Sequence, residues 1–88
     1  MRTLALAVLT AAALVGLPSV AMAASCYDLW YARNQIYDDN GYCFSTDLGM
    51  ETFDNDDCWT TKPHLTKKEQ KLVAQIQAQE RAKHCHVN

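Results

Sequence analysis

The sequence predicts an all-α fold: a small domain of two longer helices and one short helix, stapled by disulfides and preceded by a cleaved signal peptide. Three observations predict it. The chain of 88 residues opens with an apolar run and contains four cysteines. Two later segments combine helix-capping residues with apolar residues at three- and four-residue steps. At this length the chain forms one domain at most.

Residues 1–23 have the three parts of a secretory signal peptide. Arg2 supplies the positive charge, residues 4–15 the apolar segment, and Ala21-Met22-Ala23 the small-residue cleavage site. Gly16 and Pro18 interrupt the apolar run at a length short for a membrane span, so a transmembrane helix is the weaker alternative.

A lipoprotein acylated at Cys26 is a further alternative, but no leucine stands three positions before that cysteine. We therefore expect a Sec-type signal peptide cleaved after Ala23 and a product, residues 24–88, that is secreted or periplasmic. This product has no expected transmembrane segment.

The charge of this product argues against nucleic acid as a partner. Of eight Lys and Arg residues only Arg2 lies in the leader, which leaves seven against ten Asp and Glu and a net charge of about −3. Nucleic-acid binders carry a basic face. A chain of this size also buries only about 60% of its unfolded surface, so its apolar core needs additional crosslinks.

The four cysteines supply those crosslinks, because exported proteins meet oxidising conditions. Three pairings are possible. We favour Cys43 with Cys58 and Cys26 with Cys85, since Cys26 opens the first helix and Cys85 closes the last, and these ends meet if the helices run antiparallel. On the loop-entropy model the two disulfides contribute about 3 and about 4 kcal/mol.

Metal binding is the alternative use of these side chains. Zinc held by cysteines with His64, His84 or His86 lacks the short C-x-x-C spacing of zinc sites. The acidic run at residues 54–57 lacks the glycine and the third oxygen ligand of a calcium loop. We expect no metal and no cofactor.

The first helix is predicted to begin with a capping box formed by Ser25 and Asp28. It ends near Asn40 and Gly41, and Gly41 tolerates the left-handed conformation that stops a helix. One face of this helix forms the expected core stripe, which consists of Cys26, Leu29, Trp30, Arg33, Ile36 and Tyr37.

A short helix follows, capped by Ser45 or Thr46 and contributing Leu48 and Phe53 to the core. The last helix is predicted from a capping box at residues 66–69 to about His84. Its thin apolar stripe is Leu72, Val73 and Ile76, and its far end, with Gln79, Glu80 and Lys83, is expected at the surface, anchored by Cys85.

Arg33 is the unusual member of the core stripe, because a buried guanidinium needs partners. One hypothesis is an anion or carboxylate clamp. The favoured one is a structural clamp that bonds backbone carbonyls or an aspartate of residues 54–57 while its stem packs on Trp59.

Beside the core face a second stripe combines aromatic and polar side chains that suit glycan or peptide contact: Tyr27, Tyr31, Asn34 and Asp38. The alternative is that the two tyrosines cover the edge of the core. No nucleophile motif or buried carboxylate is evident, so we expect no catalytic residue and no enzyme activity.

Residues 29–44 carry a family resemblance. Seven of them match the pattern R-N-x-I-Y-A-R-H-G-Y-x-F: Arg33, Asn34, Ile36, Tyr37, Gly41, Tyr42 and Phe44. This segment resembles the YARHG domain, a small module of exported bacterial proteins. Asp38, Asp39 and Asn40 replace the Ala, Arg and His of the family name.

The resemblance implies an extracytoplasmic module that binds a partner, without a catalytic residue to carry over. We therefore expect a non-enzymatic binding module of the bacterial cell envelope, with peptidoglycan or an envelope protein as partner. The alternative is a secreted inhibitor or effector of an envelope enzyme. Both rest on compartment and family analogy, and the ligand and oligomeric state stay open.

Overall fold

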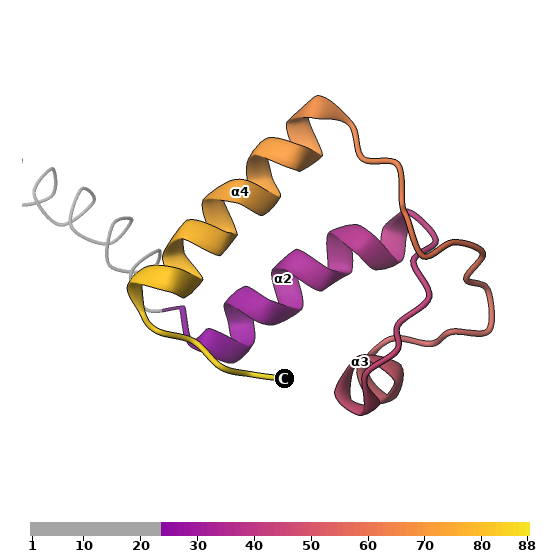
Figure 1. Cartoon of the computed structure of the whole chain (residues 1–88), viewed down its shortest axis with the longest axis horizontal. Coiled ribbons are helices and arrows are strands. Elements are labelled where there is room, and N and C mark those ends of the chain that lie inside the picture. Colours follow the sequence, from indigo (N-terminus) through magenta and orange to yellow (C-terminus); the bar gives the residue numbers. More distant parts are fainter. Residues whose placement is uncertain (1–23) are drawn as a thin grey trace, which may run out of the picture.

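The computed structural model describes residues 24–88, so the expected signal peptide and its cleavage site lie outside the described residues. The described chain contains three helices, α2 (Cys26–Asp39), α3 (Asp47–Thr52) and α4 (Lys67–Ala82) (Figure 1). Within this part of the chain the only strand-like pairing is an isolated parallel bridge between Tyr42 and Thr60. The predicted all-α fold of two longer helices and one short one is confirmed.

Helix α2 has defined signals at both ends. At its start the Asp28 N–H donates to Ser25 Oγ (3.1 Å) and the Ser25 N–H donates to the Asp28 carboxylate (3.2 Å), which completes a capping box. At its end Gly41 adopts φ +84°, and the Tyr42 N–H reaches back to the carbonyl of Tyr37. This is the Schellman arrangement, in which a glycine in the left-handed region stops the helix.

Helix α4 is built in the same way. Thr66 and Glu69 form its capping box. At the other end His84 takes the left-handed conformation (φ 54°), and the Cys85 N–H donates to the carbonyl of Glu80 (2.9 Å). The last regular residue is Ala82, slightly before the expected end at about His84, because the left-handed residue turns the chain out of the helix and brings Cys85 beside Glu80.

The two longer helices run antiparallel and splay apart from the end where α2 begins and α4 finishes (Figure 1). At that end Cys26 is bonded to Cys85, with their Cα atoms 5.4 Å apart. The second disulfide joins Cys43 to Cys58. These are the two pairings that the sequence favoured, and the first fixes the closed end of the helix pair.

The core is mainly aromatic and is built around α2. Its buried centre is Trp30, Phe44 and Phe53, and the Phe44 and Phe53 rings stack with centroids 4.9 Å apart. The chain end returns beneath α2 toward α3, and Val87 packs against this cluster (Figure 1). Helix α4 contributes one buried apolar side chain, Val73. Apart from its contacts with α2, this helix therefore packs little against the rest of the domain.

A crosslinked loop follows α2. The Trp59 and Thr60 N–H groups both donate to the carbonyl of Gly41, and the Cys43 N–H donates to the carbonyl of Thr60 (2.8 Å). The side chain of Asn55 both accepts from the N–H of Phe44 and donates to its carbonyl. Residues 41–44 and 55–60 therefore form one braced unit.

Gly41→Ala tests the stop of α2. Any Cβ at position 41 would overlap the indole ring of Trp59, and the positive φ disfavours other residues. We expect the substitution to lower the free energy of unfolding, measured by urea denaturation, by about 2–4 kcal/mol, the combined cost of the left-handed conformation and of overpacking.

Adding Trp59→Ala to that variant should recover the overpacking part of the loss, because it removes the overlapping ring. A loss below about 0.5 kcal/mol for Gly41→Ala, the range of ordinary surface substitutions, would contradict this account.

Candidate functional site

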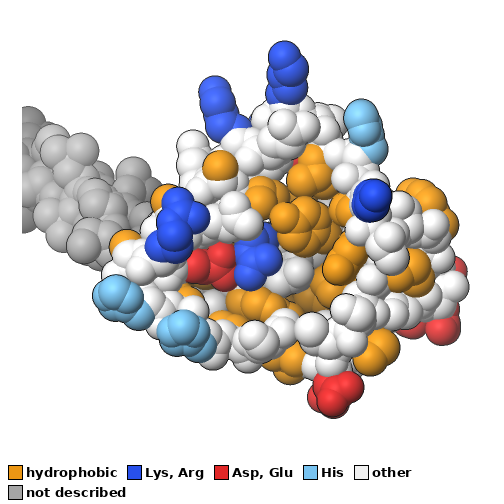
Figure 2. Space-filling view, in the orientation of Figure 1, with side chains coloured by type: hydrophobic (Ala, Val, Ile, Leu, Met, Phe, Trp, Pro, Cys, Tyr) orange, Lys and Arg blue, Asp and Glu red, His pale blue; other side chains and the backbone are white. Residues whose placement is uncertain are grey.

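A polar cleft of about 530 Å³ lies at the closed end of the helix pair, between α2, α4 and the chain end. Its lining consists of Trp30, Arg33, Asn34, Gln77, Glu80, Arg81, Cys85, His86, Val87 and Asn88. Figure 2 shows the corresponding face as a hollow with apolar side chains, in which an acidic and a basic group meet. The cleft is therefore a depression with apolar parts and fixed charges.

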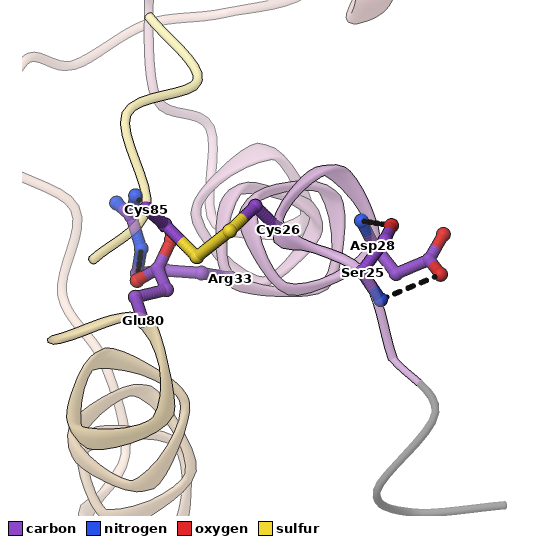
Figure 3. Close-up of a disulfide and its surroundings, with 6 residues drawn as sticks. All are labelled: Ser25, Cys26, Asp28, Arg33, Glu80 and Cys85. Atoms are coloured by element: carbon purple, nitrogen blue, oxygen red, sulfur yellow. Dashed lines mark hydrogen bonds and ion pairs between the residues drawn. A yellow bond between two sulfur atoms is a disulfide. The ribbon is translucent and has the colours of Figure 1, made fainter. Parts of the chain in front are cut away.

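The charged pair in the cleft is Arg33 with Glu80 (Figure 3). Arg33 Nε donates to one carboxylate oxygen at 2.8 Å and Nη2 donates to the other at 3.1 Å. The side chains are 22% and 13% exposed. A bidentate, partly buried pair of this kind is stronger and better oriented than a surface ion pair.

This geometry corrects two sequence-based expectations. Arg33 bonds neither backbone carbonyls nor the acidic turn at residues 54–57, and Trp59 does not cover its stem, because Arg33 faces α4 while the Trp59 side chain lies on Gly41. Glu80 does not lie free at the surface, since it turns toward α2. Val73, Ile76 and Glu80 lie at i, i+3 and i+7, a spacing that continues the buried side of α4 and could have indicated Glu80.

Asn34 also departs from the expected contact stripe. It is 8% exposed, and its side-chain amide donates to the carbonyl of Trp30 (2.9 Å) within α2. Asn34 lines the cleft together with Trp30 and Arg33, so it does not stand with Tyr31 on the exposed surface of α2.

Tyr27 and Tyr31 remain at the surface. They are 47% and 40% exposed, while the Tyr31 ring lies 5.1 Å from that of Phe53 and the Tyr27 ring lies 5.5 Å from that of Trp30. Both tyrosines therefore cover the edge of the core and still present aromatic surface to solvent, and their contact with a glycan or peptide stays a prediction.

Asp38 lies elsewhere, in a smaller recess of about 240 Å³ that also includes Gly41, Asp54, Asp57 and Trp59. Burial raises the pKa of the Asp38 carboxyl above its ordinary value, and the negative charges of Asp39 and Asp54 add to the rise. The four residues of the expected contact stripe are thus divided among the cleft, the tyrosine surface and this recess.

Trp59 stands out in the recess because it is 74% exposed although it belongs to the braced loop. The disulfide beside it and the two hydrogen bonds to Gly41 hold its backbone in place. The sequence analysis expected this side chain to cover the stem of Arg33, but the register of residues 58–60 against 41–43 places it over Gly41 at the surface.

Asn40 connects the far end of α2 to α4, because its side chain donates to the carbonyl of Ile36 (2.7 Å) and to the Glu69 carboxylate (3.0 Å). The pKa of Glu69 lies below its ordinary value, first because the backbone of Thr66 donates to it and then because Asn40 does. Asn40 thereby acts as a strut between the helices.

Both disulfides are formed, so no cysteine in residues 24–88 carries a thiol. Within the same residues, no cluster of three His, Cys, Asp or Glu is arranged to hold a metal ion. None of the helices there combines the length and apolar character that crossing a bilayer requires.

Fold and cleft together define a class: small helical domains crosslinked by disulfides that offer a polar depression between two helices. The model of the YARHG domain matches residues 6–81 of the chain, well over half of it. The protein therefore belongs to the YARHG domain family, whose members are small extracytoplasmic modules. The chain has no match among curated proteins or among solved structures.

Asp38→Asn tests the charge repulsion in the recess. A folded-state pKa above the unfolded value means that ionised Asp38 opposes folding, so its penalty is present at pH 7 and disappears as the pH falls below the unfolded pKa. We expect the variant to unfold at a higher urea concentration at pH 7, and to match the wild type at about pH 2, where the carboxyl is protonated in both states.

Glu51→Gln, at an exposed carboxylate on α3, is the matched control for the loss of one negative charge. If both substitutions raise the midpoint equally, the effect is one of net charge and the recess has no special role.

Proposed function

We propose that this domain is a non-enzymatic binding module of the bacterial cell envelope and that the cleft between α2 and α4 is its binding site. The observation that carries the proposal is the cleft itself: a depression large enough for a small ligand or a few residues of a polymer, lined by hydrogen-bonding side chains. The disulfide at its closed end keeps the two walls together without a ligand.

The compartment is part of the proposal. Membership in a family of extracytoplasmic modules and two disulfides support an oxidising location outside the cytoplasm. We further propose that export removes residues 1–23 by cleavage after Ala23, and that the product is periplasmic or secreted.

A binding role suits the cleft better than a catalytic one. The carboxylate of Glu80 accepts two hydrogen bonds from Arg33, which occupies the group that would otherwise serve as a general base. Other polar groups of the lining, among them the amides of Asn34 and Gln77 and the imidazole of His86, are suited to orienting a ligand.

Peptidoglycan is the first partner to test, with an envelope protein as the other. Peptidoglycan combines sugar hydroxyls, amides and carboxylates, which complement amide and guanidinium groups. The half-exposed Tyr27 and Tyr31 offer flat aromatic surface near the start of α2, as is common in glycan and peptide contacts.

The test is a pull-down of the exported, oxidised protein on purified sacculi. We expect enrichment with the sacculi, whereas enrichment no greater than that of an unrelated acidic protein of equal size would count against the proposal. In the same preparation the intact mass should correspond to a chain that begins at Ala24. It should be lower than the mass of the reduced chain by the four hydrogen atoms lost when two disulfides form. A mass that includes residues 1–23 would refute cleavage.

Trp59 favours a second function, inhibition or regulation of an envelope enzyme. A rigidly held and largely exposed tryptophan is typical of the residues that dominate protein interfaces. Under this alternative we expect one envelope protein to co-purify with the domain in a one-to-one complex. Trp59→Ala should abolish this complex and leave binding to sacculi unchanged.

A further inference from the structure

We propose that the free edge of the Arg33 guanidinium binds a carboxylate group of the ligand in the cleft. This inference rests on the proposed binding function, since it names the chemical group that the same cleft recognises. It also unites the two roles considered for Arg33, because one edge of the guanidinium is structural and the other is available.

The guanidinium of Arg33 has more N–H donors than Glu80 uses. A guanidinium has five N–H groups in one plane. Its side edge, Nε and Nη2, is occupied by the two oxygens of Glu80. The end edge, formed by Nη1 and the second N–H of Nη2, has no hydrogen-bond partner among the described residues, and no side-chain nitrogen there is buried without a partner. Three N–H groups of Arg33 thus have no hydrogen-bond partner among residues 24–88, and Nη1 is not fully buried.

The Arg33 side chain is held in place at the wall of the cleft. Arg33 belongs to the lining of the cleft, and Glu80 holds its guanidinium from the α4 side while Trp30, 3% exposed, packs in the core beside it. A donor whose rotamer is already fixed loses little conformational entropy when it binds. An end edge of this kind matches the spacing of two carboxylate oxygens and can bind them bidentately.

The charged side chains of the lining determine which ligand groups the cleft attracts. Glu80 neutralises Arg33, so the remaining ionisable side chains of the lining are Arg81 and His86. Arg81 adds a positive charge near the end of α4, and His86 adds the hydrogen-bonding groups of its imidazole. The side chains of the cleft therefore favour an anionic group, although the domain as a whole is acidic.

The ligand class follows from these steps: a glycan or peptide that presents a carboxylate and hydrogen-bonding groups. Carboxylates of peptides and of acidic sugars share this chemistry. The experiment separates the two sources by using peptide-bearing disaccharide fragments of peptidoglycan, the same fragments with their carboxylates amidated, and oligogalacturonate.

Binding is measured by NMR titration of the ¹⁵N-labelled, oxidised protein. The expected result is that one of the free carboxylate probes shifts the Nε–H signal of Arg33 and the backbone signals of the cleft. The amidated fragments should bind about tenfold more weakly, the effect of losing one charge-assisted hydrogen bond. Equal binding of free and amidated fragments, with no response of oligogalacturonate, would overturn the proposal.

Arg33→Lys is the decisive variant, because lysine keeps the charge and can still reach Glu80 but has no second planar edge. We expect its affinity for the carboxylate probe to fall by about tenfold. Lys71→Gln, at an exposed cation of α4 outside the cleft, is the matched control and should leave binding unchanged.

If Arg33→Lys disturbs folding, the titration of the wild-type protein, followed at the Arg33 Nε–H signal, is the test of carboxylate binding. No shift of this signal on saturation with any probe would overturn the inference. The outcome is separable from the proposed function: capture by sacculi with no carboxylate dependence refutes the carboxylate site alone, and no capture by sacculi and no binding of any probe refutes both.

Discussion

The disulfide between Cys26 and Cys85 is the constraint on which the arrangement of the helices depends. It joins the first residue of α2 to the segment that follows α4. Helix α4 has one buried apolar side chain, Val73, and lies outside the aromatic core. Burying a side chain of this size contributes only about 1.5–3 kcal/mol, which is small beside the conformational entropy lost in ordering a helix of 16 residues. The covalent link removes much of that entropy from the unfolded chain.

The position of Glu80 follows from the same constraint. The Schellman turn at His84 sets Cys85 beside Glu80, and the disulfide then holds both against α2. Arg33, two turns into α2, meets the carboxylate there. The charged pair and the cleft are therefore consequences of one crosslink and one helix-terminating turn, and Asn40 with Glu69 braces the open end.

Local signals in the sequence predicted most of the fold. The capping pairs Ser25 with Asp28 and Thr66 with Glu69, and the glycine at position 41, act within a few residues, so they could be identified without knowledge of the packing. The disulfide pairing followed from a single assumption, that the two longer helices are antiparallel. The all-α class rested on these features together.

The site was less predictable because it depends on which residues face each other across the fold. Arg33 could be singled out as a buried cation, but its partner depends on the rotation of α4. The amide of Asn34 belongs to the cleft rather than to the tyrosine surface, a difference of one helix face. Trp59 is exposed because the 58–60 segment pairs with residues 41–43, a register that no local pattern encodes.

The central claim is tested most directly by removing the Cys26–Cys85 disulfide alone, in the Cys26→Ala, Cys85→Ala double variant, and measuring amide hydrogen exchange along the chain. If the crosslink holds α4 in place, amides of α4 should lose protection far more than those at the centre of α2, and overall stability should fall by about 4 kcal/mol. Protection of α4 equal to that of the wild type would contradict the account.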